Sequence, residues 1–265
     1  PEEIIQSFSY HVTSERLCLI MNSNLHPNEI YTGKLGSKKI KQITFSNPQF
    51  NDLSFADQKT IFWQASDGKR IEGVLTYPLR YRKGKYPLVL QIHGGPEGVS
   101  LDGWSTRPTY PVQLLAANGF VVLEPNYRGS GGRGVAFSKA DHDDLGGMEF
   151  QDVLKGIDHL VDMGLVNPEK VGTGGWSYGG YFSALAATMH SEKFKASMVG
   201  AGLTNMISFM GTTDIPREMS IVHWNQWWFD NMNLHWERSP LSHINNAKTP
   251  TLIIHGMKDE RVHPE

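Results

Sequence analysis

The sequence is poor in the features that mark several classes of protein. Its 265 residues include one cysteine, Cys18, so an intrachain disulfide and a cysteine metal cluster are both excluded. No apolar run approaches the roughly 18 residues that a membrane-spanning helix needs. No charged-then-apolar leader opens the chain. Basic and acidic residues nearly cancel, 25 against 27, which argues against nucleic-acid and polybasic membrane partners.

Motifs that bind metals or cofactors are missing as well. The sequence holds no H-E-x-x-H, no calcium loop and no P-loop, and its histidines lack metal-ligand spacing. We therefore expect no metal and no cofactor. The length fits one large domain, or one domain plus a fragment, with enough apolar residues to bury a core.

Residues 1–55 alternate in short β-like runs, at 16–21, 29–32 and 41–45, separated by Asn, Pro, Gly and Ser. This pattern predicts antiparallel strands joined by tight turns. Three or four such strands bury little surface alone, so we interpret them as one unit of a larger structure. The pattern changes after this segment, and we place a second domain at 56–265.

From about residue 60, predicted strands alternate with predicted helices. Continuous apolar runs at 87–92 and 120–123 are typical of strands buried on both faces. Helical spacing at 153–161 is followed by a break at Asn167-Pro168. The other predicted elements are strands at 71–77, 171–175, 198–200 and 251–255, and a helix at 181–189. Such alternation predicts a mostly parallel α/β sheet with helices on both faces.

The segment Gly175-Trp-Ser-Tyr-Gly179 matches G-x-S-x-G between a predicted strand and a predicted helix. That context defines a nucleophile elbow, the turn that exposes the reactive serine of α/β-hydrolases. The two glycines leave room for a tight turn, and the helix N-terminus favours developing negative charge. We predict that Ser177 is a nucleophile. The alternative is a glycine-rich turn with an incidental serine.

A nucleophilic serine needs a histidine base that a carboxylate orients, and in this fold the chain order is Ser, acid, His. Asp259 lies in the short loop after the apolar strand at 251–255, so we predict that it is the orienting acid. The other acids considered are Asp214, Asp230 and the adjacent Glu260. The alternative for Asp259 is a surface acid that pairs with Lys258 or Arg261.

The histidine base is the missing member of this triad. His263 is only four positions from Asp259 in the same loop, whereas the usual base comes from a separate loop after one more strand. We interpret His263 as a polar loop residue and expect the base to follow residue 265. The last strand and helix of the domain would then also lie outside this sequence.

The turn His93-Gly-Gly-Pro96 follows the first buried strand of the second domain. A glycine-rich turn at this place offers a backbone N–H to the oxyanion, and the residue after the nucleophile offers the second. We predict an oxyanion hole from the N–H groups of Gly95, preferred over Gly94, and Tyr178. For His93 we expect a structural hydrogen bond, since it precedes the serine and ends a strand.

The string Gly129-Ser-Gly-Gly-Arg-Gly134 offers a rival interpretation, because G-x-G-x-x-G after a strand marks dinucleotide-binding folds. The helix that should begin at the glycines is replaced by a polar, broken segment at 139–147. No acid ends a second strand about 20 residues further on. We interpret the glycines as a tight loop near the pocket.

Tryptophans are concentrated between residues 222 and 237. Trp224, Trp227 and Trp228 are predicted pocket-wall residues, because hydrolases insert lids and pocket walls between core strands and aromatics supply large apolar area. The alternative is ordinary core or domain-contact packing.

Taken with these residues, the sequence resembles the prolyl oligopeptidase family of serine peptidases, in its acylaminoacyl-peptidase and dipeptidyl-peptidase branches. The resembling stretches are Ser66-Asp-Gly68, Ile71-Glu-Gly73, His93-Gly-Gly-Pro96, Asn126-Tyr-Arg-Gly-Ser130, Phe150-Gln-Asp-Val153, Gly175-Trp-Ser-Tyr-Gly-Gly-Tyr181 and His255-Gly-Met-Lys-Asp-Glu-Arg-Val262. The resemblance implies an α/β-hydrolase fold, Ser177 as nucleophile, Asp259 as orienter, and Gly95 and Tyr178 as oxyanion donors.

The resemblance also implies short peptides as substrates, cleaved through an acyl-enzyme. Residues 1–55 resemble the last blade of the β-propeller that precedes the catalytic domain in this family, and 56–265 that domain without its C-terminal end. Met257 and His263 depart from the family's usual residues. The alternatives are a carboxylesterase on the same fold and a catalytically incomplete binding fragment. An uncovered sheet at the end of the hydrolase domain predicts homo-oligomers.

Overall fold

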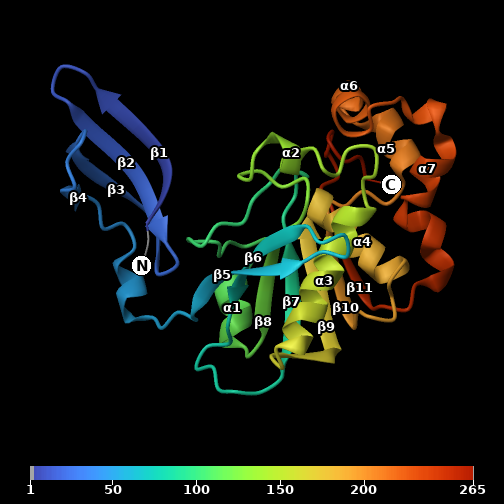
Figure 1. Ribbon diagram of the computed structural model, residues 1–265, viewed down its shortest axis with the longest axis horizontal. Helices are drawn as coiled ribbons and strands as arrows, with labels where there is room; N and C mark the ends of the chain where they lie inside the picture. Colours follow the sequence, from blue (N-terminus) through green and yellow to red (C-terminus); the bar gives the residue numbers. More distant parts are fainter. Residues whose placement is uncertain (1–2, 265) are drawn as a thin grey trace.

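The computed structural model describes residues 3–264 and contains two separate sheets (Figure 1). The first has four antiparallel strands in the order β1-β2-β3-β4. Their bounds are β1 Ile4–His11, β2 Arg16–Ser23, β3 His26–Lys34 and β4 Ile40–Gln42. Only Leu19, Met21 and Tyr31 form a buried apolar cluster in this sheet, so it contributes a small core of its own.

The second sheet has seven strands in the order β11-β10-β9-β7-β8-β6-β5. Their bounds are β5 Gln58–Gln64, β6 Arg70–Thr76, β7 Tyr86–Ile92, β8 Val121–Asn126, β9 Val166–Trp176, β10 Ala196–Gly200 and β11 Thr251–Ile254. The strands from β8 to β11 pair in parallel, and β5 and β6 add an antiparallel edge. The mostly parallel sheet predicted from the sequence is confirmed.

Helices cover both faces of the seven-stranded sheet. Along β8, Val121 and Leu123 belong to the main core with α3 and α4, whereas Val122 packs on the other face with Val112 of α1. The α-helices are α1 Val112–Ala117, α2 Val135–Ser138, α3 Met148–Asp162, α4 Tyr178–Thr188, α5 Met206–Thr212, α6 Pro216–Glu218 and α7 Met232–Glu237. The shorter helical turns are η1 Pro48–Asp52, η2 Met219–His223, η3 Trp228–Asp230 and η4 Pro240–Asn246. In Figure 1, α5, α6 and α7 lie on the side of the sheet far from β1–β4.

Several element boundaries differ from the sequence-based expectation. The helix α3 ends at Asp162, and the chain turns at Gly164, whose φ is +71°. Asn167 and Pro168 therefore do not break the helix, because they already belong to β9. The strands β1 and β5 were not predicted from the sequence. Their exposed polar residues alternate only irregularly with apolar ones, so the apolar residues show no clear strand pattern.

None of the helices between residues 3 and 264 has the length and the apolar character that spanning a bilayer requires. Across the same residues, no group of three or more His, Cys, Asp or Glu side chains is arranged to hold a metal ion.

Candidate active site

Ser177 occupies the turn between β9, which ends at Trp176, and α4, which begins at Tyr178. Its backbone has φ 59° and ψ −120°, a conformation that side chains other than glycine rarely adopt. Its N–H donates to Gly200 O on β10 at 2.8 Å, which anchors the turn to the sheet. The side chain is half-buried, and Ser177 Oγ has no hydrogen bond to any residue in 3–264. Such a strained, accessible serine has the geometry of a nucleophile elbow.

The glycines on either side of the serine are required by close packing. A Cβ at Gly175 would lie 2.4 Å from Gly179 O, and one at Gly179 would lie 1.9 Å from Ile92 O. Both distances are far inside van der Waals contact. The elbow therefore needs glycine at these two positions, for the steric reason inferred from the sequence.

The turn that follows β7 packs directly against the serine. A Cβ built on Gly94 would lie 3.3 Å from Ser177 Cβ, so the backbone of the His93–Pro96 turn borders Ser177. Gly95 is exposed at this turn and has φ +137°. The two backbone segments predicted to supply oxyanion donors, at residues 95 and 178, thus both adjoin Ser177.

His93 fastens this turn to its surroundings. Nδ1 donates to Gly94 O at 2.8 Å, and Nε2 accepts from Ser130 Oγ at 3.0 Å. The ring stacks on Tyr127 with centroids 4.5 Å apart. Burial lowers the pKa of His93 to about 4, so the imidazole is neutral at physiological pH. This arrangement fits the structural role expected for His93 and leaves neither ring nitrogen facing the serine as a base.

The glycine string forms a loop that packs against the same turn. Ser130 contributes the hydroxyl bound to His93, and Gly131 N donates to Glu97 O at 3.1 Å. The helix that follows, α2, has four residues and starts after the last glycine. A dinucleotide-binding loop leads directly into a long helix, so the string instead has the character of the tight loop that we expected near the pocket.

The strand order places Asp259 at the same edge of the sheet as Ser177. Trp176, Gly200 and Ile254 lie side by side in the register of β9, β10 and β11. The chain leaves β9 into Ser177 and leaves β11 into the loop of Asp259. Strands are about 4.8 Å apart, so the two loops start about 10 Å from each other, which leaves room for an imidazole between them.

The carboxylate of Asp259 is held by its own loop. Oδ1 accepts from Arg261 N at 3.0 Å and from Val262 N at 2.9 Å. The side chain of Arg261 pairs instead with Asp214, so the alternative in which Asp259 is a surface partner of Arg261 does not apply. Among residues 3–264, the polar contact recorded for Asp259 Oδ2 is His255 Nε2, at 3.8 Å. One oxygen is thus fixed by backbone, and the other is available to a further donor.

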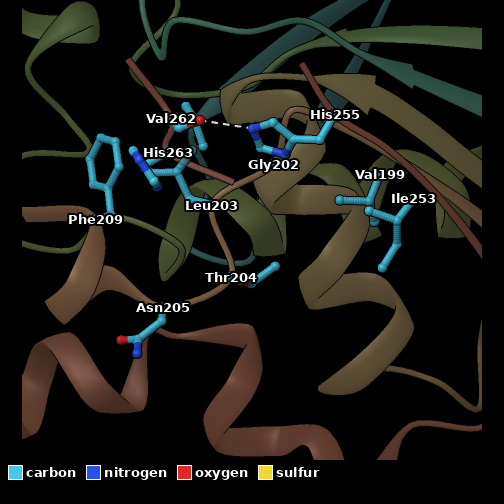
Figure 2. A pocket seen from close by; sticks show the side chains of 10 residues that line it. All are labelled: Val199, Gly202, Leu203, Thr204, Asn205, Phe209, Ile253, His255, Val262 and His263. Carbon is cyan, nitrogen blue, oxygen red and sulfur yellow. Dashed lines mark hydrogen bonds between the residues drawn. The ribbon is translucent and has the colours of Figure 1, made fainter. Parts of the chain in front are cut away.

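Two histidines lie in this loop region. His255 directly follows β11, and its Nε2 donates to Val262 O at 2.7 Å, as Figure 2 shows. His263 is exposed, with Nδ1 3.2 Å from Pro264 O. Neither of them hydrogen-bonds to Ser177 among the residues that the structure describes. No role was predicted for His255 from the sequence. Its position at the end of an apolar strand was nevertheless consistent with a residue that hydrogen-bonds to the following loop.

A small cavity of about 60 Å³ lies beside the Asp259 loop (Figure 2). Apolar side chains of Leu203, Phe209 and Val262 line it together with His255 and His263. The cavity lies between the helical segment after β10 and the loop after β11. It is too small for more than a methyl-sized group or one or two waters.

The three tryptophans predicted to form a pocket wall differ in burial and in their neighbours. Trp224 is fully buried, with its ring centroid 4.3 Å from that of His235. Trp228 is partly buried against the main core. Trp227 is 40% exposed and stacks on Phe229 at 5.8 Å. None of the three lines the cavity beside Asp259.

A mostly parallel sheet covered on both faces, with a strained serine between β9 and α4, defines an α/β-hydrolase fold. Residues 104–265 match the family described as prolyl oligopeptidase family. The chain belongs to the prolyl oligopeptidase family, as its motifs suggested.

The similarities extend over nearly the whole chain. It is 31% identical over 263 residues to the uncharacterized peptidase YuxL of Bacillus subtilis (strain 168), covering 98% of this chain and 39% of that protein. It is 28% identical over 244 residues to dipeptidyl-peptidase 5 of Porphyromonas gingivalis, covering 89% and 35%. The structure of Pyrococcus horikoshii acylaminoacyl peptidase superimposes with a TM-score of 0.87 at 26% identity, covering 99% of this chain and 41% of that one. The chain thus spans about two fifths of the length of these relatives.

Proposed function

We propose that this chain carries the nucleophile of a serine peptidase that hydrolyses short peptides through an acyl-enzyme on Ser177. The observation that supports the proposal most directly is the backbone of Ser177, strained at φ 59° between β9 and α4 and bordered by the His93–Pro96 turn. Relatives named peptidase, dipeptidyl-peptidase and acylaminoacyl peptidase favour peptide substrates.

In the proposed reaction, Ser177 Oγ attacks the carbonyl carbon of the scissile peptide bond and gives its proton to a histidine base. The carbonyl oxygen becomes an oxyanion that accepts hydrogen bonds from the N–H groups of Gly95 and Tyr178. The intermediate collapses to an acyl-enzyme, and the amine leaves with the proton from the histidine. Water, deprotonated by the same histidine, then attacks the acyl carbon, and Ser177 regains its proton.

Asp259 is the proposed orienter of that histidine. Backbone donors fix its Oδ1, so Oδ2 is left to accept the Nδ1–H of an imidazole placed between the two loops. We propose that the base follows residue 265 in the full-length gene product. We further propose that residues 1–55 are the last blade of a β-propeller, that 56–265 belong to the catalytic domain, and that Trp224, Trp227 and Trp228 belong to the wall of its substrate pocket.

The test is covalent labelling of the full-length gene product with an uncharged fluorophosphonate. We expect the label on Ser177, identified by mass spectrometry of the digested protein, and no label after Ser177→Ala. The matched control is Ser183→Ala, which removes a serine hydroxyl from the same helix outside the elbow. Labelling elsewhere, or none at all, would falsify the nucleophile assignment.

A carboxylesterase on the same fold is the second candidate, because ester and amide hydrolysis share the tetrahedral intermediate. Rates on acyl and dipeptidyl anilides, compared with simple p-nitrophenyl esters, separate the two. A peptidase turns over the anilides, whereas an esterase cleaves only the esters. Loss of both activities with intact folding identifies a binding protein.

A further inference from the structure

Tyr178 joins the oxyanion site to the interior of the domain. Its backbone N–H is a proposed oxyanion donor, whereas its side chain is buried, with 2% of its surface exposed. The phenol hydroxyl donates a short hydrogen bond to Glu149 Oε1 on α3. The same oxygen accepts from Gly146 N at 2.6 Å. The position of the residue after the nucleophile therefore depends on where the Glu149 carboxyl lies.

The carboxyl of Glu149 faces a second buried carboxyl, that of Asp141, and each of the two groups shifts the pKa of the other. Their exposed fractions are 0% and 2%. Apart from the N–H of Asp141 itself, no donor among residues 3–264 reaches Oδ1 or Oδ2 of Asp141 or Oε2 of Glu149. A hydrogen bond between two carboxyl groups requires a proton on one of them, because ionised carboxylates only accept.

The charges around the pair do not compensate two carboxylates. The titratable groups that face it are Tyr127 after β8, Tyr178 and Tyr181 on α4, Glu97 in the turn after β7, and Asp144 with its ion-pair partner Arg238. Arg238 acts on the Tyr181 phenol, and its guanidinium is bound to Asp144. Burial raises the pKa of Asp141 to about 7, and burial followed by the charge of Asp141 raises the pKa of Glu149 well above its ordinary value.

We propose that Asp141 and Glu149 share one proton and that this protonated pair positions Tyr178, so that its backbone N–H points into the oxyanion site. The inference rests on the proposed function of Ser177. Both acids are positioning residues, because Glu149 binds the Tyr178 phenol and the Gly146 N–H, and Asp141 acts through Glu149. When the shared proton leaves, two negative charges face each other in a buried site, the carboxyls separate, and Tyr178 loses its anchor.

Three conservative variants separate this role from general support of the fold. Tyr178→Phe removes only the hydroxyl that binds Glu149. The control Tyr181→Phe removes an equally buried hydroxyl one turn later on α4, which donates to Arg238 O at 2.7 Å. Glu149→Gln keeps an acceptor for Tyr178 and Gly146, and its amide donates permanently to Asp141 in place of the shared proton.

The first measurement needs neither a histidine base nor a substrate. In a Ser177→Cys background, the rate of alkylation by uncharged iodoacetamide against pH reports how well the elbow stabilises a thiolate. The N–H groups at the start of α4 favour the thiolate at position 177, so displacing the N–H of residue 178 is expected to slow alkylation near neutral pH by about threefold or more. We expect this loss in Tyr178→Phe and a change of less than about twofold in Tyr181→Phe, with circular dichroism spectra unchanged in both.

The second measurement is the pH profile of kcat for peptide hydrolysis by the full-length gene product. The profile should fall at high pH as the pair loses its proton, and Glu149→Gln should remove that limb. Tyr178→Phe should lower kcat by about tenfold or more while KM stays within about twofold, since the oxyanion forms only in the transition state. Absence of hydrolysis in the wild type overturns the proposed peptidase function but leaves the alkylation result decisive. Equal alkylation rates in the two tyrosine variants overturn the positioning role, as does an unchanged profile in Glu149→Gln.

Discussion

The strain at Ser177 leads to a stability difference of unusual sign. At φ 59° and ψ −120°, the residue has the conformation of the first central position of a type II′ turn, where glycine is favoured. Holding a non-glycine residue there costs about 1–3 kcal/mol. Replacing serine by alanine keeps that cost, whereas replacing it by glycine removes it. Glycine in turn adds about 0.4–1 kcal/mol of unfolded-state entropy.

We therefore expect Ser177→Gly to be more stable than Ser177→Ala by about 0.5–2 kcal/mol. Loss of the hydroxyl contributes little to either variant, since Ser177 Oγ has no hydrogen-bond partner within residues 3–264. The assay is urea denaturation of the two variants, followed by tryptophan fluorescence and circular dichroism. In thermal melts the same difference corresponds to about 2–4 °C per kcal/mol in a chain near this size.

The same pair of substitutions at Ser183 provides the matched control. Ser183 lies in the interior of α4, where glycine is less favourable than alanine by about 1 kcal/mol. The order of stabilities should thus be opposite at the two positions, although both are serines of one strand–helix unit. If Ser177→Gly is less stable than Ser177→Ala, the elbow stores no backbone strain and the reasoning is refuted.

Two further predictions concern the interior and the sheet edge. Burial raises the pKa of Glu124 from 4.5 to about 7, so between these values the folded state holds one more proton than the unfolded state. The free energy of unfolding is therefore highest below about pH 4.5 and falls by about 3 kcal/mol in total as the pH rises through about 7. Urea titrations at several pH values should show that Glu124→Gln abolishes this loss. The same dependence of the unfolding free energy on pH in both proteins would contradict the prediction. On β11, Leu252 and Ile253 are 59% and 66% exposed at the edge of the sheet, and we expect self-association of the chain in light scattering that Leu252→Lys reduces. A monodisperse wild-type monomer would contradict this proposal.

The parts of the site that depend on local sequence were predictable. Gly175 and Gly179 flank the serine within one turn, and a continuous apolar run precedes it, so the strand, the elbow and the helix follow from neighbouring residues. The edge of the sheet that carries Asp259 followed likewise from the apolar strand before its loop.

The contacts between distant segments were not predictable in this way. Arg261 pairs with Asp214, 47 positions earlier, whereas sequence reasoning offered it to Asp259 in its own loop. The buried pair of Asp141 and Glu149 looked like ordinary polar residues of a broken segment and a helix start. No local pattern reveals that these two acids face each other beside a tyrosine, because Asp141 lies in the turns before α3, Glu149 lies in the first turn of α3, and Tyr178 comes from α4.

The ion pair between Arg261 and Asp214 links the loop of Asp259 to the segment that follows α5. Asp214 N also donates to Glu260 O at 3.1 Å, so one residue of the segment after α5 clasps the Asp259 loop by side chain and by backbone. A ligand that displaces the segment of Asp214 is therefore expected to move the loop of Asp259 as well. Substitutions near Asp214 are therefore expected to change the orientation of the proposed acid, Asp259, without any contact with Ser177.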